Sequence, residues 1–170
     1  MDIFVIKTSR INEFNQDLLK EFQKKEISNQ KTWETHCFTY LMLDKILKSV
    51  YKIENREVLF ENKKPKLKSN EKHFSISHSE EYIAIAFSDY KCGIDIEKIK
   101  NRDFKKISDR MHFNAKTLQE FYQEWTRFEA EYKLNKTPSS SKHFQIENYS
   151  LTAVSENPKE KYEIYLSNNQ

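Results

Sequence analysis

The stretch "KCGIDIEKIK", residues 91–100, contains the only glycine of this 170-residue chain and a closely spaced pair of acids. Average usage would give a chain of this length roughly a dozen glycines. Gly93 would let the backbone turn tightly after residues 89–92 and pass close to a neighbouring element or a ligand. Side chains alternate along a strand, so Asp95 and Glu97 share one face while Ile94 and Ile96 share the other. The pair indicates a cation site, or else a half-exposed strand with a polar outer face.

A third acid stands out in the helical pattern of residues 118–134. When these residues are projected at about 100° each, one arc of about 120° collects the large apolar side chains. They are Leu118, Phe121, Tyr122, Trp125, Phe128 and Tyr132. Glu129 falls inside this expected core-facing arc, and a carboxylate among aromatic rings must be paired, protonated or metal-bound. Lys133, four residues further on, offers the alternative of an intrahelical salt bridge.

Together the three carboxylates predict a Mg²⁺ site, because Mg²⁺ prefers oxygen ligands and is usually shared with substrate phosphates. Groups that bind phosphate should therefore lie nearby. The chain has a lysine-rich segment at 63–68 and the serine- and histidine-containing segment 75–79. The alternatives are a solvated basic loop for the first segment and a turn for the second.

The periodicity predicts an α+β fold, because strands and helices mix without regular alternation. Residues 3–6 read as a strand and residues 12–50 as mostly helical. A strand ends near residues 77–78, and two further strands at 82–88 and 93–99 read as a hairpin with its turn near 89–91. The helix 118–134 follows, and two or three strands between 143 and 166 close the chain.

Composition limits the class of protein. With 37% hydrophobic residues and 170 positions, the chain fits one domain or two small halves that share a core. A net charge of +3 suits an acidic partner or a phosphate-rich ligand. Cys37 and Cys92 lie far apart in the sequence and indicate reduced thiols in a cytoplasmic protein. There is no apolar run of about 18 residues, and the start of the chain does not read as a signal peptide.

The order of these pieces is more specific than any one of them. The segment "FSISHSEEYIAIAFSDYKCGIDIEKI", followed some thirty residues later by "WTRFEAEYKL", resembles the 4′-phosphopantetheinyl transferases of the long, single-chain type. That family's pattern is a strand ending in Ser-His-Ser, a hairpin, a Gly-Ile-Asp-Ile-Glu strand and a helix opening Trp-Ser/Thr-x-Lys-Glu-Ala. The match spans residues 73–134.

This resemblance implies a holo-acyl-carrier-protein synthase activity. The enzyme would move the phosphopantetheine arm of coenzyme A onto a serine of an apo carrier protein, with Mg²⁺, and release 3′,5′-ADP. It also implies two similar α/β halves, residues 1–100 and 101–170, related by a pseudo-twofold in one compact unit with coenzyme A in the cleft. We expect a cytoplasmic monomer that acts on a fatty-acid acyl carrier protein and binds neither nucleic acid nor membrane.

The resemblance also assigns roles by position. The residues matching the family's metal ligands are Asp95, Glu97 and Glu129. Lys133 matches a lysine that contacts phosphate and assists deprotonation of the serine, so Glu129 and Lys133 are the expected catalytic pair. Ser77 and His78 match positions that bind coenzyme A phosphates. Lys64 matches a lysine that binds the 3′-phosphate of the nucleotide.

Other positions depart from the family pattern. Phe128 replaces the family's lysine before the helical glutamate, and Lys63 replaces a glycine. Cys37 and Phe38 replace basic residues after His36, and the chain is shorter than typical long members. A non-catalytic homologue that binds carrier proteins is therefore one alternative.

A metal-dependent nuclease is a second alternative, with Asp95 and an E-x-K formed by residues 131–133. Nucleases of that pattern carry E-x-K on a strand, whereas this segment is strongly helical. Basic residues after the acidic strand would steer an acidic carrier, or else form an ordinary solvated helix face. They are Arg102, Lys105, Lys106 and Arg110.

Overall fold

The computed structural model describes residues 1–9, 30–61 and 64–167. Helices and strands mix within these ranges, which confirms the α+β class. The helices are α2 (Gln30–Ser49), α3 (Lys105–Met111) and α4 (Leu118–Leu134). The strands are β1 (Asp2–Lys7), β2 (Val58–Glu61), β3 (Lys64–Leu67), β4 (His73–Ser79), β5 (Tyr82–Ser88), β6 (Cys92–Lys98), β7 (Ser140–Ile146), β8 (Tyr149–Ser155) and β9 (Glu163–Leu166). Residues 12–29 of the expected early helical region lie outside the described residues.

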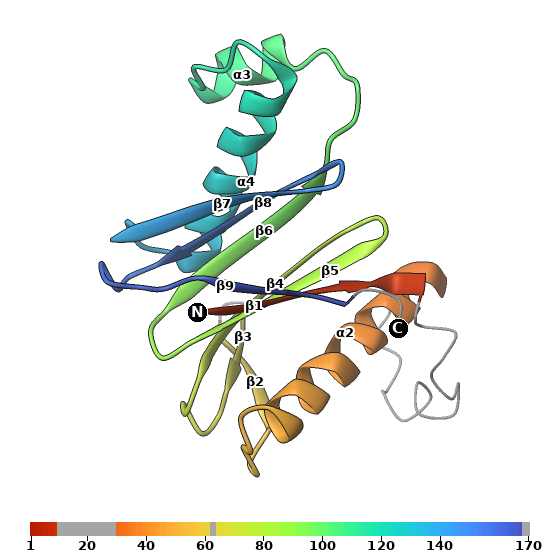
Figure 1. The fold of residues 1–170 in the computed structure, drawn as a ribbon, viewed down its shortest axis with the longest axis vertical. Coiled ribbons are helices and arrows are strands. Elements are labelled where there is room, and N and C mark those ends of the chain that lie inside the picture. The colour runs from red at the N-terminus through yellow and green to blue at the C-terminus, as the bar shows by residue number, and fades with distance from the viewer. Residues whose placement is uncertain (10–29, 62–63, 168–170) are drawn as a thin grey trace.

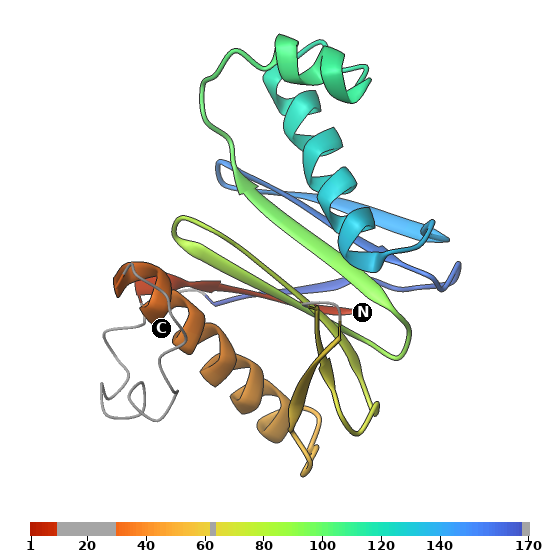
Figure 2. The ribbon, with the colours of Figure 1, turned by 180° about the vertical axis from the view of Figure 1, so that it is seen from behind.

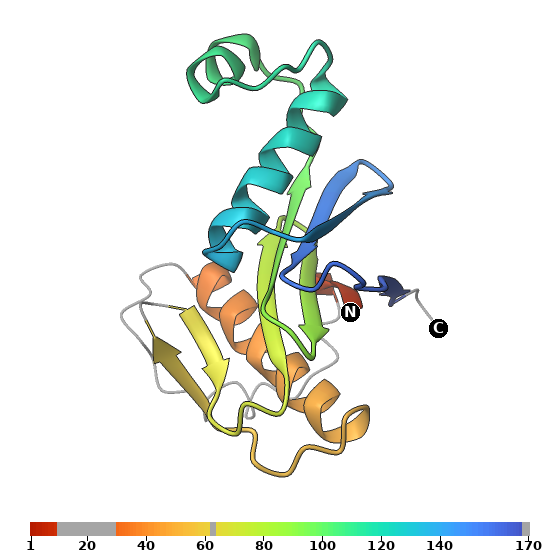
Figure 3. The same cartoon turned by 90° about the vertical axis from the view of Figure 1, so that its left-hand side faces the viewer.

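Two sheets pack face to face, and each has a helix on its outer side (Figure 1). The first sheet has the strand order β4-β5-β1-β9, and the second has the order β6-β8-β7. Helix α2 covers the first sheet and α4 covers the second. Strands β2 and β3 form a separate antiparallel pair beside α2, as Figure 3 shows.

The space between the sheets holds an apolar core. Ile3 and Val5 of β1 face Ile94 and Ile96 of β6 in one buried cluster that also contains Leu151. The expected alternation of β6 is therefore confirmed, since its isoleucines enter this core while its acids lie on the opposite face. That opposite face is the one covered by α4.

The expected hairpin between residues 82–88 and 93–99 is wrong. Strand β5 pairs with β4 on one edge and with β1 on the other, so it has no free edge for β6. Strand β6 instead crosses to the second sheet, pairs with β8 and runs alongside α4 (Figure 2). The hairpin in this region is β4–β5, closed by a two-residue turn in which Glu80 has a φ of 50°.

Helix α4 has the bounds that the sequence predicts. Thr117 and Glu120 form a capping box at its start, and Asn135 ends it in the left-handed conformation. The predicted core-facing arc is partly wrong, however, because Phe128 is 41% exposed and Tyr132 is 76% exposed. The buried side chains of the helix are Phe121, Tyr122, Thr126, Ala130 and Leu134.

Gly93 marks the place where β6 and α4 approach each other most closely, opposite the small residue Ala130. A Cβ atom at position 93 would lie 2.0 Å from the carbonyl oxygen of Ala130, so only glycine lets β6 and α4 approach this closely. Gly93 does not have a positive φ, so the close approach, rather than a tight turn, requires glycine here.

The two sheet-and-helix layers share one chain order. The series β1, α2, β4, β5 and the series β6, α4, β7, β8 each run strand, helix, hairpin, and in each the last strand pairs antiparallel with the first. Strand β6 pairs with β8 and so belongs to the second sheet. Strand β9, near the end of the chain, pairs in parallel with β1 of the first sheet. The division of the chain at residue 100 stays a prediction.

Two smaller expectations concern cysteines and membranes. Cys37 and Cys92 are both buried free thiols, as predicted. Burial raises the pKa of the Cys92 thiol to about 12, so this group is protonated at neutral pH. Among the described helices, none is long and apolar enough to span a membrane.

Candidate active site

Asp95 lies where β4, β6 and α4 meet. Ser77 of β4 donates a hydrogen bond to Asp95 Oδ1 at 2.7 Å. The ammonium of Lys133 on α4 donates to the same oxygen at 2.7 Å and to the carbonyl of Ile94 at 3.0 Å. Three of the residues singled out in the sequence therefore come together, although they are 18 and 38 positions apart along the chain.

The two oxygens of Asp95 have different surroundings. Asp95 is only 4% exposed, and Oδ1 accepts both hydrogen bonds described above. Its other oxygen, Oδ2, is buried and has no hydrogen-bond partner within the described part of the chain. A buried carboxylate oxygen without a partner is costly, so Oδ2 is a position where a bound cation would be stabilising.

Glu97 lies two residues further along β6 and is half-buried. The hydroxyl of Ser79 donates to Glu97 Oε2 at 2.9 Å and accepts from the backbone N–H of Lys98 at 3.1 Å. Desolvation raises the pKa of Glu97, and the carboxylates of Asp95 and Glu129 raise it further, against the opposing effects of Ser79 and Lys133. Asp95 and Glu129 are thus both within electrostatic reach of Glu97.

Glu129 is half-buried on α4, one turn before Lys133. The intrahelical salt bridge weighed as an alternative does not form, because the Lys133 ammonium pairs with Asp95 instead. Over residues 1–9, 30–61 and 64–167, no group of three or more His, Cys, Asp or Glu side chains is close enough to hold a metal ion by itself. Mg²⁺ usually takes one or two carboxylates and completes its shell with waters and substrate phosphates. The free Asp95 oxygen and the adjacent acids fit that mode of binding, and the ligand set stays a prediction.

Lys64 of β3 reaches the same corner of the molecule. Its ammonium donates to the backbone carbonyl of Lys133, at the C-terminal end of α4. Desolvation lowers the pKa of Lys64, and the positive charges of Lys91 and Lys133 lower it further, although Cys92 opposes them. Lys64 with two further ammonium groups close enough to act on it forms an electropositive corner suited to an anion.

His78 separates Ser77 and Ser79 on β4, and its side chain reaches solvent. Desolvation by the surrounding protein lowers the pKa of His78, and the ammonium of Lys133 lowers it further, while Asp95 acts in the opposite direction. The imidazole is therefore neutral at pH 7. A neutral imidazole can donate one hydrogen bond and accept another.

The site contains serines that the sequence analysis did not single out individually. Ser79 holds Glu97, and Ser75 accepts a hydrogen bond from the backbone N–H of Ile94 at 3.2 Å. Together with Ser77 they occupy every second position of β4 and so share one face of the strand. This alternation was the signal in the sequence that could have identified them. All three hydroxyls bond β6, so β4 and β6 are joined by side chains across the boundary between the two sheets.

The basic residues proposed to steer a carrier are Arg102, Lys105, Lys106 and Arg110, and all four are exposed. They lie in α3 and just before it, at the N-terminal end of α4 (Figure 1). Glu129 and Lys133 lie toward the other end of that helix. The steering role stays a prediction.

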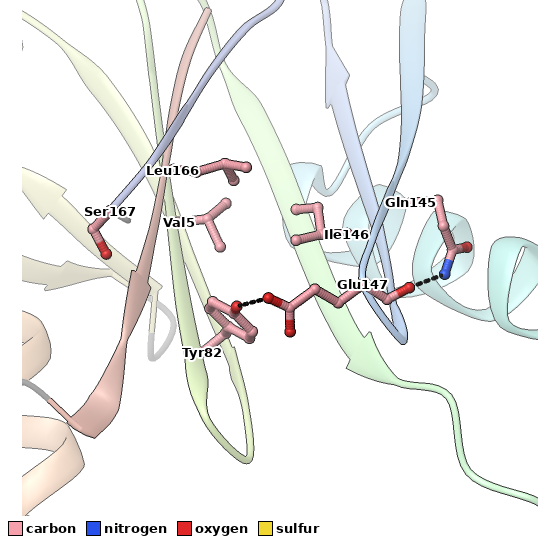
Figure 4. Close-up of a pocket in the computed structure, with 7 residues that line it drawn as sticks. All are labelled: Val5, Tyr82, Gln145, Ile146, Glu147, Leu166 and Ser167. Atoms are coloured by element: carbon pink, nitrogen blue, oxygen red, sulfur yellow. Dashed lines mark hydrogen bonds between the residues drawn. The ribbon is translucent and has the colours of Figure 1, made fainter. Parts of the chain in front are cut away.

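A shallow pocket of about 180 Å³ lies elsewhere, between the β1, β5 and β9 strands and the β7–β8 turn (Figure 4). Its lining residues are Val5, Tyr82, Gln145, Ile146, Glu147, Leu166 and Ser167. The Tyr82 hydroxyl donates to Glu147 Oε1 at 3.1 Å across it. None of the predicted site residues lines this pocket.

Comparison with known proteins finds a partial relative of the chain. No protein-family model matches the chain. A 77-residue segment is 39% identical to the 4′-phosphopantetheinyl transferase gsp of Aneurinibacillus migulanus and covers 44% of this chain. The same segment covers 32% of that relative, so the match extends over about a third of its length. Over this segment the chain is similar to a phosphopantetheinyl transferase.

Proposed function

We propose that this protein transfers the 4′-phosphopantetheine arm of coenzyme A to a serine of an apo carrier protein and releases 3′,5′-ADP. The observation that carries the proposal is the buried Asp95, held by Ser77 and Lys133 through one oxygen while the other lacks a partner. The partial similarity to a phosphopantetheinyl transferase supports the same reaction.

Asp95, Glu97 and Glu129 would hold Mg²⁺, which when bound would polarise the pyrophosphate of coenzyme A and offset its charge. Ser77 and Ser79 fix the orientation of Asp95 and Glu97 through their hydroxyls. Glu129 is the group that takes the proton of the attacking serine. The Lys133 ammonium lies beside Asp95 and contacts a phosphate of coenzyme A. Its positive charge also assists deprotonation of the attacking serine.

Lys64 and His78 are the proposed contacts to the rest of the coenzyme. The electropositive corner formed by Lys64, Lys91 and Lys133 suits the 3′-phosphate. His78 is neutral at pH 7 and accessible, so it can donate a hydrogen bond to a phosphate oxygen without adding charge. Ser77 donates to Asp95, so its contribution to phosphate binding would need its hydroxyl to be shared.

The proposal includes the pseudo-twofold arrangement, with halves 1–100 and 101–170 and the coenzyme between them. The matching order of the series β1-α2-β4-β5 and β6-α4-β7-β8 supports the symmetry itself, although the second series begins with β6, before residue 100. The partner is an acidic carrier, for which we propose the fatty-acid acyl carrier protein. The protein would work as a cytoplasmic monomer, without nucleic acid or membrane.

A non-catalytic carrier-binding homologue is the second candidate, and one observation favours it. Phe128 places an exposed ring one residue before Glu129, where the family pattern has a lysine. The nuclease alternative loses support, because residues 131–133 lie on a helix and Glu131 accepts a hydrogen bond from Arg127 at 2.8 Å.

Intact-mass spectrometry tests the proposal. The protein is mixed with an apo acyl carrier protein, coenzyme A and Mg²⁺, and the carrier is expected to gain the mass of one phosphopantetheine. Asp95→Asn and Glu129→Ala should each slow this gain by about 10³-fold, because each removes a proposed ligand of Mg²⁺ and Glu129→Ala also removes the group that takes the serine proton. Glu124→Ala, on the same helix, is the matched control and should leave the rate within about twofold.

The other outcomes separate the candidates. Tight binding of the carrier without any mass gain would establish the non-catalytic homologue. Cleavage of RNA or DNA by the Mg²⁺-loaded protein would establish the nuclease. If the protein neither transfers phosphopantetheine nor binds the carrier, the proposal is overturned.

A further inference from the structure

The face of the second sheet that α4 covers carries two polar rows. In the register of β6, β8 and β7, Asp95 lies beside Thr152, which lies beside His143. The next row on that face is Glu97, Ser150 and Gln145. Only the row of Gly93 and Val154 packs against the apolar Ala130 and Leu134 of the helix.

Thr126 of α4 sits over both polar rows. Its hydroxyl oxygen lies 2.9 Å from Thr152 Oγ1 and 3.1 Å from Ser150 Oγ, and it donates to the carbonyl of Tyr122 at 2.9 Å. Thr126, Ser150 and Thr152, here called the hydroxyl cluster, are each at most 2% exposed. His143 Nδ1, 3.2 Å from Thr152 Oγ1, extends the network to β7.

Stability alone does not explain a hydroxyl cluster at this place. A buried hydroxyl contributes little net free energy when it is paired and costs about 1–3 kcal/mol when it is not. Apolar side chains of similar volume would hold helix and sheet at least as firmly. The hydroxyls differ from apolar groups in their directionality, since sliding or rotating α4 would break the contacts of Thr126 with Ser150 and Thr152.

The hydroxyl cluster is connected to the candidate site both through helix α4 and through strand β8. Thr126 precedes Glu129 by three residues and Lys133 by seven, so all lie on adjoining turns of one helix. Its partners Thr152 and Ser150 are the strand neighbours of Asp95 and Glu97. We propose that Thr126 is a positioning residue: the hydroxyl cluster sets the register of α4 against β6 and thereby places Glu129 and Lys133 opposite Asp95 and Glu97.

A double-mutant cycle in the unfolding equilibrium tests this without reference to the proposed function. The variants are Thr126→Val, Lys133→Met and their combination, measured by urea unfolding of the whole chain. If the hydroxyl cluster places Lys133 beside Asp95, the effects of the two substitutions are coupled. The unfolding equilibrium constant of the double variant should then differ by about fivefold from the value expected if the two single effects were independent. Additivity within about twofold would overturn the proposal.

Thr39→Val provides the matched control. Thr39 is also a buried helical threonine, and its hydroxyl likewise bonds the carbonyl four residues earlier, that of Thr35, at 2.7 Å. It lies on α2, in the apolar layer on the far side of the first sheet. Thr39→Val and Lys133→Met should therefore be additive within about twofold. Equal coupling at both threonines would mean a general loss of stability and would overturn the proposal.

The kinetic arm of the test rests on the proposed function. Thr126→Val should lower kcat for carrier modification by about tenfold or more and change KM for coenzyme A by less than about twofold, because the defect is in alignment. Thr126→Ser keeps the hydroxyl and should restore most of kcat, and Thr39→Val should leave kcat unchanged. A Thr126→Ser variant as slow as Thr126→Val would contradict the proposal.

Two results would change which measurement decides the proposal. If Thr126→Val does not fold, Thr152→Val removes the strand-side partner of the same hydroxyl and takes its place in both arms. If the wild-type protein transfers nothing, the proposed function fails, and the unfolding cycle alone decides whether Thr126 positions Lys133.

Discussion

The two sheet-and-helix layers have the same strand pairing but join helix to sheet with different chemistry. Phe38 and Leu47 of α2 lie in a large apolar cluster with Ile83, Ile85 and Phe87 of β5. Helix α4 meets its sheet through a cluster of only three buried apolar residues, with hydroxyls and an ion pair beside it. One interface supplies stability, and the other gives up apolar contact to hold charged groups in place.

The difference shows how one arrangement can serve two purposes. Apolar contacts are non-directional and tolerate small displacements, so the α2 layer can be stable without defining an exact register. The α4 layer has to hold Asp95 and Lys133 at hydrogen-bond distance, which demands directional contacts and a close backbone approach at Gly93. Its stability depends on the core that it shares with the first sheet.

The largest effect is expected from Gly93→Val, which tests whether close approach defines the α4 layer. Its Cβ would lie 2.0 Å from the Ala130 carbonyl oxygen, and a helix backbone cannot yield as a side chain can. We expect a loss of about 4 kcal/mol or more, enough to remove the native fold of the second sheet. Circular dichroism with urea unfolding measures it, and Lys98→Ala at the end of the same strand should cost less than about 1 kcal/mol.

Leu47→Ala tests the opposite half of the comparison. Leu47 is fully buried beneath α2, so truncation leaves a cavity in the apolar cluster and should cost about 3 kcal/mol. Carrier modification at a temperature well below unfolding should be unaffected, because the apolar cluster that contains Leu47 includes none of the candidate site residues. Val50→Ala, at the exposed end of the same region, is the control and should change stability by less than about 0.5 kcal/mol. A selective loss of kcat in Leu47→Ala would contradict the conclusion that the α2 interface supplies stability while the α4 interface holds the charged groups in place.

The smallest effect concerns Glu160, which joins the two layers by accepting hydrogen bonds from Ser88 of β5 at 2.9 Å and Ser155 of β8 at 2.8 Å. Desolvation acts to raise the pKa of Glu160, but hydrogen bonds from the N-terminal ammonium, Ser155 and Ser88 outweigh it, so the pKa lies below 4.5. A lowered pKa stabilises the fold above about pH 4.5, and the contribution is lost as the pH falls through the lowered value.

Glu160→Gln should therefore cost about 1–2 kcal/mol at about pH 7, and the deficit should shrink at about pH 3. Urea unfolding at the two pH values measures this difference. Glu71→Gln, at an exposed position, is the control and should cost little at either pH. A deficit that stays constant with pH would show that the ionised form of Glu160 does not join the layers.

Parts of the fold follow from local pattern. The α4 helix has the predicted bounds because its capping box and its C-terminal Asn135 are set by neighbouring residues. Strand β6 has the predicted alternation, since apolar and acidic residues cannot exchange faces without burying charge. The meeting of Asp95, Ser77 and Lys133 was expected from the resemblance to a family, and no spacing in this chain would have shown it.

Other features depend on what lies next to each element. The hairpin predicted between residues 82–88 and 93–99 fails because both edges of β5 are already occupied, which a local pattern cannot reveal. The exposure of Phe128 and Tyr132 depends on which side of α4 faces the protein interior, and the helical projection alone did not show this. The role of Thr126 was invisible, since its partners come from a strand some 24 residues away.

The sequence by itself determined the bounds of α4, which face of β6 is acidic and that one glycine has a special place. Only the tertiary structure decided that β6 leaves β5 for another sheet, that Lys133 pairs with Asp95 rather than Glu129, and that hydroxyls lie beneath α4. The physical reason is range. Propensity and alternation act between neighbours in the chain, whereas strand pairing, close packing and ion pairing depend on groups that folding brings together.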